Sequence, residues 1–135
     1  MLYMLDTDIS SYIIKGGYGP VEKHLADTSP ADICISAITR AELLYGLKTL
    51  PAKHRLHESV RRFLKVTNTL AWDADAAGYH ADIRHQLKAA GTPIGDMDIF
   101  IAAHAIAADA ALVTNNVRHF KQIRQQALML VNWME

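Results

Sequence analysis

Apolar and polar positions along the chain follow two patterns, and each pattern predicts one kind of element. Short apolar runs bounded by turn residues predict buried strands at residues 1–5, 33–36, 69–72, 111–114 and 128–133. Apolar residues at helical spacing predict helices at residues 10–15, 37–50, 52–66, 74–91 and 98–110. Strands that alternate with helices predict an α/β fold in which helices flank a mostly parallel sheet.

Several of these helices begin or end at residues that usually occupy such positions. Ser36 and Asp73 are expected to cap the helices that follow them, and Pro51 is expected to begin the helix at 52–66. Gly91 is typical of a helix end. The glycine-rich segment 16–20 predicts a turn.

Length and composition favour one soluble domain. A chain of 135 residues buries roughly two-thirds of its unfolded surface, so we expect a single domain over residues 1–135. The single cysteine, Cys34, lies between isoleucines and is expected to be a buried hydrophobe. The N-terminus lacks the basic region and the long apolar region expected of a secretory signal, and no apolar stretch approaches the ~20 residues of a membrane helix. We therefore expect a protein of the reducing cytoplasm.

The charges cancel in total but are separated along the chain. Fourteen Lys and Arg residues balance fourteen Asp and Glu residues. Basic residues are concentrated at 53–65 and again at 118–124. Runs of this kind are usually solvated surfaces, although a separate cluster of acids would favour a role in binding phosphates.

Acidic residues occur where a parallel sheet gathers its binding sites. Asp6 directly ends the first strand, while Asp96 and Asp98 open the buried helix at 98–110. Glu42 lies in the helix after the second strand, and Asn116 follows the fourth strand. Sites in open parallel sheets form outside the carboxyl ends of the strands, where the strand order reverses. These side chains are expected to meet there.

Most of the acids also have a structural explanation. Asp8 could cap the helix at 10–15, residues 39–42 fit a capping box that includes Glu42, and Asp96 or Asp98 could cap the helix at 98–110. Asp6 is harder to explain in this way, because an unpaired carboxylate deep at the sheet edge is costly.

A divalent cation would offset the cost of burying Asp6. Carboxylate and amide oxygens suit Mg²⁺ or Mn²⁺, which are held directly by one or two carboxylates. The histidines do not follow a zinc pattern. His104 is instead expected to be a hydrogen-bonded polar residue of the buried helix.

Four segments together resemble the PIN-domain ribonucleases, and most closely the VapC toxins of bacterial toxin–antitoxin pairs. These segments read LDTDI, ISAITRAELLYGL, PIGDMDIFIAAHA and LVTNNVRHF. The resemblance covers the whole chain in the order and spacing of the family. It implies a single PIN domain, a PIN-like three-layer sandwich with a mostly parallel central sheet flanked by helices.

The resemblance also implies roles for particular residues. The three acids of the family fall on Asp6, Glu42 and Asp98, of which Asp6 and Asp98 would hold Mg²⁺, or Mn²⁺ in its place. Asp96 is an accessory acid, and the fourth acidic position falls on Asn116, which lacks the charge. The groups expected to orient the metal ligands are Thr7, Asp8 and Thr114.

The activity implied is a Mg²⁺-dependent endoribonuclease that cleaves RNA, with tRNA as the expected substrate. The implied partners are a VapB-like antitoxin and a second copy of the chain in a homodimer. An antitoxin helix would lie in an apolar groove, for which Tyr12, Ile13, Leu44 and Tyr45 are candidate walls. The basic residues expected to hold RNA phosphates are Arg55, Arg61, Arg62, Arg118 and Arg124.

Three other functions remain open from the sequence. The DTD at residues 6–8 also resembles the Asp-x-Asp signature of haloacid-dehalogenase-type phosphatases, where Asp6 would be a nucleophile and Asp8 a general acid. Their distal acidic motif should follow a buried strand, whereas a helix end and a turn precede Asp96. A PIN-like module that only binds RNA or protein, and a housekeeping PIN nuclease, are the remaining alternatives.

Overall fold

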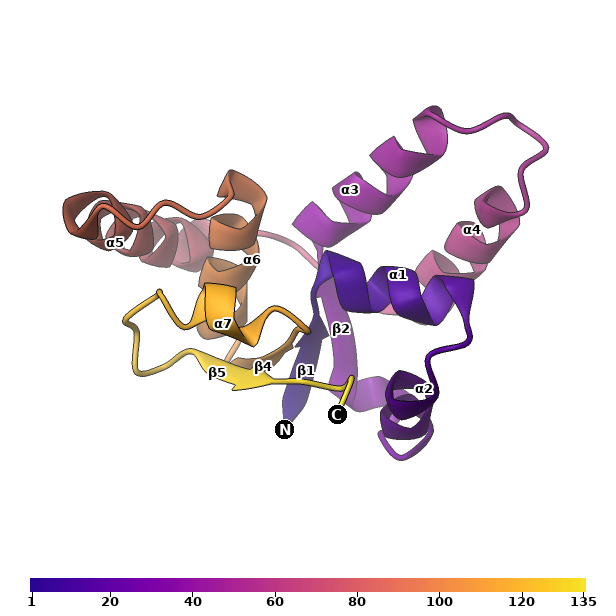
Figure 1. Ribbon diagram of the computed structural model, residues 1–135, viewed down its shortest axis with the longest axis horizontal. Coiled ribbons are helices and arrows are strands. Elements are labelled where there is room, and N and C mark those ends of the chain that lie inside the picture. Colours follow the sequence, from indigo (N-terminus) through magenta and orange to yellow (C-terminus); the bar gives the residue numbers. More distant parts are fainter.

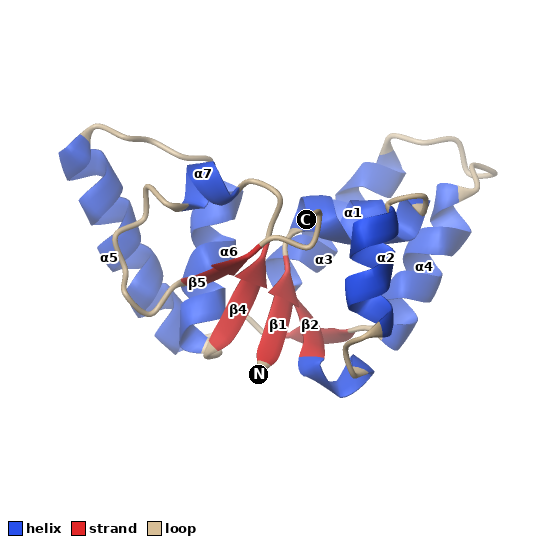
Figure 2. Cartoon of the chain, turned by 60° about the horizontal axis from the view of Figure 1, so that its bottom comes forward, coloured by secondary structure: helices blue, strands red, loops and turns tan.

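A computed structural model describes all residues from 1 to 135. Its centre is a five-stranded sheet in the order β3-β2-β1-β4-β5, and every neighbouring pair is parallel. The strands are β1 (Leu2–Leu5), β2 (Ile33–Ser36), β3 (Asn68–Leu70), β4 (Ala110–Val113) and β5 (Met129–Val131). Figure 2 shows this sheet between two groups of helices. The predicted three-layer α/β sandwich is therefore confirmed.

The helices follow the predicted order, with two additions. They are α1 (Thr7–Lys15), α2 (Gly19–Ala26), α3 (Ala37–Lys48), α4 (Leu56–Val66), α5 (Ala74–Ala90), α6 (Asp96–Ala107) and α7 (Val117–Phe120), with a 3₁₀ turn at Pro30–Asp32. Helices α2 and α7 were not predicted. The first begins inside the glycine-rich segment that indicated only a turn, and the second is a single turn with no periodicity to detect.

Several predicted boundaries were wrong: the helix expected at 10–15 begins at Thr7, the one expected at 98–110 covers Asp96–Ala107, and the strand expected at 128–133 covers only Met129–Val131. The helix expected at 52–66 begins only at Leu56, because the chain after Pro51 forms turns in which the His54 amide donates to the Pro51 carbonyl. The strand expected at 69–72 ends at Leu70. Trp72 leaves the sheet and its indole N–H donates to the Phe100 carbonyl of α6 at 3.0 Å.

The helix caps show which of the acids have a structural role as caps and which do not. Ser36 and Asp73 cap α3 and α5 as predicted, and Gly91 ends α5 in the left-handed conformation. Asp6, rather than Asp8, caps α1. The capping box at 39–42 is absent because Ser36 already caps α3, and neither Asp96 nor Asp98 caps α6, whose N-cap is Gly95. Glu42, Asp96 and Asp98 are thus not explained as caps.

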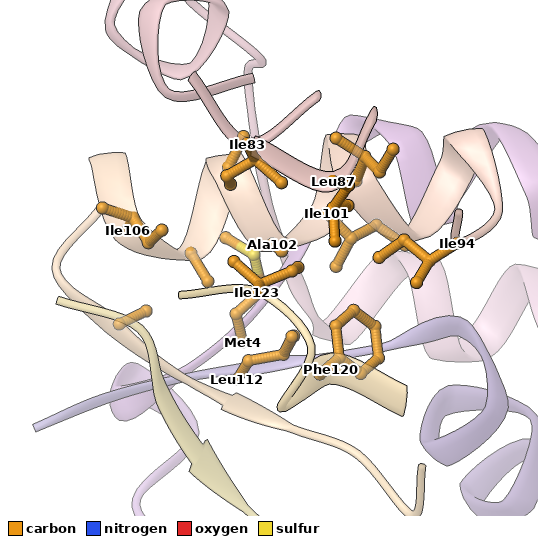
Figure 3. Packing of buried hydrophobic residues seen from close by; sticks show 14 of the residues in the cluster. Met4, Ile83, Leu87, Ile94, Ile101, Ala102, Ile106, Leu112, Phe120 and Ile123 are labelled. Atoms are coloured by element: carbon orange, nitrogen blue, oxygen red, sulfur yellow. The ribbon is translucent and has the colours of Figure 1, made fainter. Parts of the chain in front are cut away.

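Two apolar clusters fill the spaces on the two faces of the sheet. Helices α5, α6 and α7 cover one face, where Met4 and Leu112 from the strands pack against Ile101 and Phe120 (Figure 3). Helices α1 to α4 cover the other face, which receives Leu5 and its neighbours. Successive strand residues point to opposite faces, so both layers form from the same short strands. None of the helices has the length and hydropathy that a membrane crossing requires.

The strand order places a switch point between β1 and β4. From β1 the chain proceeds outward through β2 and β3, and then returns to β4 on the other side of β1. Figure 1 shows α1 and α3 on one side of this point and α6 and α7 on the other. A crevice forms at such a point because connections leave the two strands in opposite directions.

Candidate active site

Asp6 lies at the carboxyl end of β1, directly at the switch point. Its amide donates to the Val113 carbonyl of β4 at 3.0 Å, and its side chain is only 4% exposed. One carboxylate oxygen, Oδ1, accepts from the Ile9 amide at 2.8 Å and so begins α1. Capping therefore uses one lone-pair direction of one carboxylate oxygen.

The surroundings of Asp6 disfavour its negative charge. Burial raises its pKa to about 6, and the charges of Asp8 and Asp98 contribute to the rise, while the Thr114 hydroxyl and the Ile9 amide oppose it. The negative charges of Asp8 and Asp98 thus act on a carboxylate that is almost inaccessible to water. No Lys or Arg side chain forms an ion pair with Asp6.

Glu42 reaches the same region through a threonine. The Thr7 hydroxyl, one residue after Asp6, donates to Glu42 Oε1 at 2.6 Å and lies 3.3 Å from the hydroxyl of Thr39. Thr39 is fully buried on α3, so the pair joins the start of α1 to the first half of α3. Glu42 is oriented by this contact.

Asp98 lies in the first turn of α6 and faces α7. His119 Nε2 is 3.0 Å from Asp98 Oδ2. Burial raises the pKa of Asp98 and Asp8 raises it further, whereas His119 lowers it. His119 is the one site residue that the sequence did not indicate as such, because only the folding of α7 against α6 brings it to an acid 21 positions earlier.

The remaining predicted residues are less closely joined to these acids. Asp96 is exposed in the first turn of α6. Asn116 is exposed at the start of α7, and its backbone N–H donates to the buried Thr114 hydroxyl at 2.9 Å. Asp8 is exposed in the first turn of α1, where it acts through its charge.

The acids near Asp6 offer oxygen donors of the kind that Mg²⁺ prefers. No three His, Cys, Asp or Glu side chains are grouped closely enough to surround an ion by themselves. Mg²⁺ does not require such a group, because it keeps several of its waters and is held by one or two carboxylates. A buried carboxylate beside two further acids, with no Lys or Arg partner, fits that requirement.

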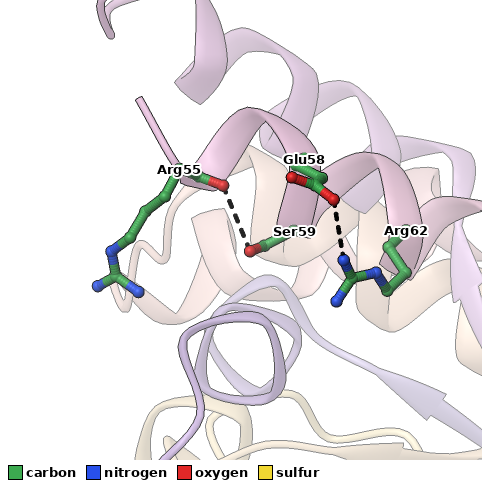
Figure 4. A network of polar contacts seen from close by, with 4 residues as sticks. All are labelled: Arg55, Glu58, Ser59 and Arg62. Atoms are coloured by element: carbon green, nitrogen blue, oxygen red, sulfur yellow. Dashed lines mark hydrogen bonds and ion pairs between the residues drawn. The ribbon is translucent and has the colours of Figure 1, made fainter. Parts of the chain in front are cut away.

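The predicted basic residues occupy different surroundings. Arg62 pairs with Glu58 at 3.0 Å on the exposed side of α4, whereas the guanidinium of Arg55 extends away from the contacts in Figure 4. Arg61 is exposed on the same helix and Arg124 follows α7. Arg118 neighbours His119 on α7, and α7 is the element that reaches Asp98.

An apolar groove begins beside Glu42, but the four predicted wall residues do not line it. The groove has a volume of about 170 Å³ and lies between α1, α3 and α4. Its lining includes Glu42 and Thr7 at one end and Ile14, Leu43, Leu47, Leu50, Leu56 and Val60 along its length. Tyr12 stacks on Tyr18 instead, Ile13 lines another cavity, and Tyr45 points outward with 71% of its surface exposed.

Comparison with known proteins agrees with this architecture. Residues 3–125 match the model of the PIN domain family. Ribonuclease VapC2 of Rickettsia felis is 36% identical over 137 residues, which span 98% of each chain. The chain belongs to the VapC family of PIN-domain proteins.

Other VapC proteins give the same result at similar identity. The tRNA(fMet)-specific endonuclease VapC of Shigella flexneri is 33% identical over 90% of this chain and 91% of that protein. Among solved structures, the DNA-bound VapBC of Salmonella typhimurium matches with a TM-score of 0.89 and 34% identity, covering 98% of this chain and 99% of that one. The resemblance seen in the sequence is therefore confirmed for the VapC family and for its fold.

Proposed function

We propose that this chain, acting as one PIN domain over residues 1–135, is a Mg²⁺-dependent endoribonuclease and the toxin of a VapBC-type toxin–antitoxin pair. The observation that carries the proposal is the buried Asp6 carboxylate at the switch point, with the charges of Asp8 and Asp98 acting on it. The nuclease names of VapC relatives support this activity. Mg²⁺ and RNA are both available in the cytoplasm, where we place the protein.

We propose a role for each residue of the site. Asp6 and Asp98 would hold the cation, with Glu42 beside them, and Mn²⁺ could replace Mg²⁺. A bound cation makes water a stronger nucleophile and offsets the charge that develops on the phosphate. Thr7 holds Glu42 in place, and His119 does the same for Asp98. The polar surroundings of these ligands also include Asp8, Asp96, Thr114 and Asn116.

The reaction is hydrolysis of a phosphodiester. The oxygen of water bonds to phosphorus while the bond from phosphorus to the 3′ oxygen breaks, and that oxygen takes a proton. The products are a 5′-phosphate and a 3′-hydroxyl. No 2′-hydroxyl is required for this step, so the preference for RNA depends on shape and on contacts to unpaired bases.

The substrate class is tRNA. This assignment is supported by the tRNA(fMet)-specific endonuclease from Shigella flexneri, which is 33% identical to this chain. The five arginines named above are candidates for phosphate contacts, and Arg118 has the best position because it adjoins His119 on α7.

The proposed partner is a VapB-like antitoxin, as in the VapBC complexes from Rickettsia felis and Salmonella typhimurium. Its helix would lie in the groove between α1, α3 and α4, which begins at Glu42. An arginine of the antitoxin could then pair with the acids by charge-assisted hydrogen bonds and exclude the cation. We also propose that two copies of the chain form a homodimer within the complex.

The decisive experiment incubates the purified protein with an initiator tRNA transcript and with total tRNA, in Mg²⁺ and in EDTA. We expect cleavage only with Mg²⁺. Asp6→Asn and Asp98→Asn should each lower cleavage by more than the roughly 10- to 100-fold that the loss of a group behind a metal ligand costs. Asp82→Asn, which changes an exposed acid of α5, should cleave like the wild type.

The same assay separates the alternatives. Cleavage that persists in EDTA would remove the metal from the proposal, and wild-type activity of either amide variant would remove that residue as a ligand. The phosphatase alternative requires hydrolysis of a generic phosphate monoester, and it is disfavoured because Asp96 and Asp98 follow a loop rather than a strand. Cleavage without growth arrest in cells would favour a housekeeping nuclease.

A further inference from the structure

A separate cavity borders Asp96 on the α5 side of the site. It has a volume of about 300 Å³ and lies between α5, the loop at 91–95 and the first turn of α6. Figure 1 shows this loop running from the end of α5 to the start of α6. The cavity is lined by Arg84, Leu87, Lys88, Gly91, Pro93, Ile94, Asp96 and Ile99.

The cavity has a cationic rim above an apolar floor. Arg84 and Lys88 are exposed, lie one helical turn apart on α5, and take part in no ion pair or side-chain hydrogen bond within the chain. Leu87, Ile94 and Ile99 are buried and form the floor.

One end of the cavity adjoins the candidate active site. Asp96 lines the cavity and is two positions before Asp98 on α6. A Cβ atom placed on Gly95, the residue between the loop and α6, would lie 3.8 Å from Asp98 Oδ2. The loop that closes the cavity therefore ends in contact range of the Asp98 carboxylate.

We propose that this cavity is an RNA subsite, in which Arg84 and Lys88 hold a phosphate near the cut and the apolar floor takes the adjoining sugar. The proposal rests on the function proposed above and adds the path of the substrate along α5. Two cations outweigh the single carboxylate of Asp96, which stands at the end nearest Asp98. The volume is at the lower end of the roughly 300–1,000 Å³ in which proteins hold small ligands, so it suits one nucleotide unit.

The test compares three double variants in the tRNA cleavage assay at several salt concentrations. In the first variant, Arg84→Gln and Lys88→Gln remove both rim charges. In the second, Lys23→Gln and Lys65→Gln remove the same total charge from exposed positions on α2 and α4. In the third, Arg84→Lys and Lys88→Arg exchange the residues and keep the charge. All four residues are exposed, and thermal melts of each variant serve as the check on folding.

Loss of the two rim charges should raise KM with little change in kcat. A phosphate contact on a single strand contributes a slope of about 0.7 to the log–log salt dependence, so losing two contacts should flatten it by about 1.4. The KM ratio between this variant and the wild type should therefore shrink about sevenfold between 50 and 200 mM salt. The control and the charge-retaining variant should keep the wild-type slope.

The outcomes distinguish the subsite from the activity itself. If the wild type cleaves tRNA and the Arg84, Lys88 variant behaves like its control, the subsite is excluded while the proposed function stands. A variant that loses kcat alone would also exclude it, because binding would then be unaffected. If the wild type does not cleave RNA at all, the proposed function and the subsite fall together.

Discussion

The Asp6 carboxylate combines a cap for α1 with an unfavourable charge. Its pKa of about 6 lies above the value near 4 of an unfolded chain, so the folded protein binds more protons between pH 4 and 6. Stability from this group therefore falls as the pH rises through that window and stays low above it. Without metal, Asp6→Asn should be more stable than the wild type by on the order of 2–3 kcal/mol at pH 7.5, with no gain at pH 4.

Urea unfolding in EDTA at the two pH values measures this difference. Asp82→Asn, an exposed acid of α5, is the matched control and should change stability by less than about 0.5 kcal/mol at either pH. A gain for Asp6→Asn that is equal at pH 4 and pH 7.5 would show that the charge is not its cause. Saturating Mg²⁺ should reduce the stability difference between Asp6→Asn and the wild type at pH 7.5, because only the wild type can bind the cation with a charged Asp6.

His119 is a second residue whose role can be tested alone. Its contact with Asp98 Oδ2 fixes the orientation of that carboxylate. We expect His119→Ala to weaken the apparent Mg²⁺ affinity by about tenfold or more, with most of kcat restored at high Mg²⁺. His85→Ala, on exposed α5 surface, is the control. Tighter Mg²⁺ binding by His119→Ala would instead mean that the imidazole competes with the cation.

Among the elements, α3 and α6 depend on one shared hydroxyl. Ser36 Oγ caps α3 by accepting from the Ile38 amide and also lies 2.6 Å from His104 Nδ1 of α6. Ser36→Ala removes a cap worth about 1 kcal/mol and leaves Nδ1 of the buried His104 imidazole unpaired, at a cost of about 1–3 kcal/mol. We expect a loss of about 2–4 kcal/mol in denaturant unfolding. Thr49→Ala, at the exposed other end of α3, should cost much less.

At the scale of the whole molecule, the groove beside Glu42 predicts that binding of the antitoxin can be weakened without loss of tRNA cleavage. Gly46 lines the groove on α3, and a Cβ there meets open space. Gly46→Gln should keep the fold and tRNA cleavage but weaken binding of the proposed antitoxin, measured by co-purification and inhibition. Gly78→Gln is a matched control, because Gly78 is equally open within α5. Equal antitoxin binding by both variants would place the partner elsewhere.

The sequence predicted the features that local chemistry determines. The strands that pair, the caps at Ser36 and Asp73 and the burial of Cys34 follow from apolar patterning and side-chain type. It missed α7 and the partner of Asp98, because one helical turn carries no period and a contact across 21 positions is set by packing. It offered Asp8 as a possible cap of α1, whereas Asp6 is the cap, and nothing local shows that Asp6 can both end a strand and begin a helix.

The position of β5 in the chain has a consequence for synthesis on the ribosome. The Thr114 amide beside Asp6 donates to the Val131 carbonyl at 2.9 Å, and Trp133 is buried in the cluster beneath α1 to α4. The packing around Asp6, which is synthesised first, is therefore complete only after residue 133 has left the ribosomal exit tunnel. Until then a nascent chain lacks part of the packing around Asp6, and we expect it to cleave no RNA.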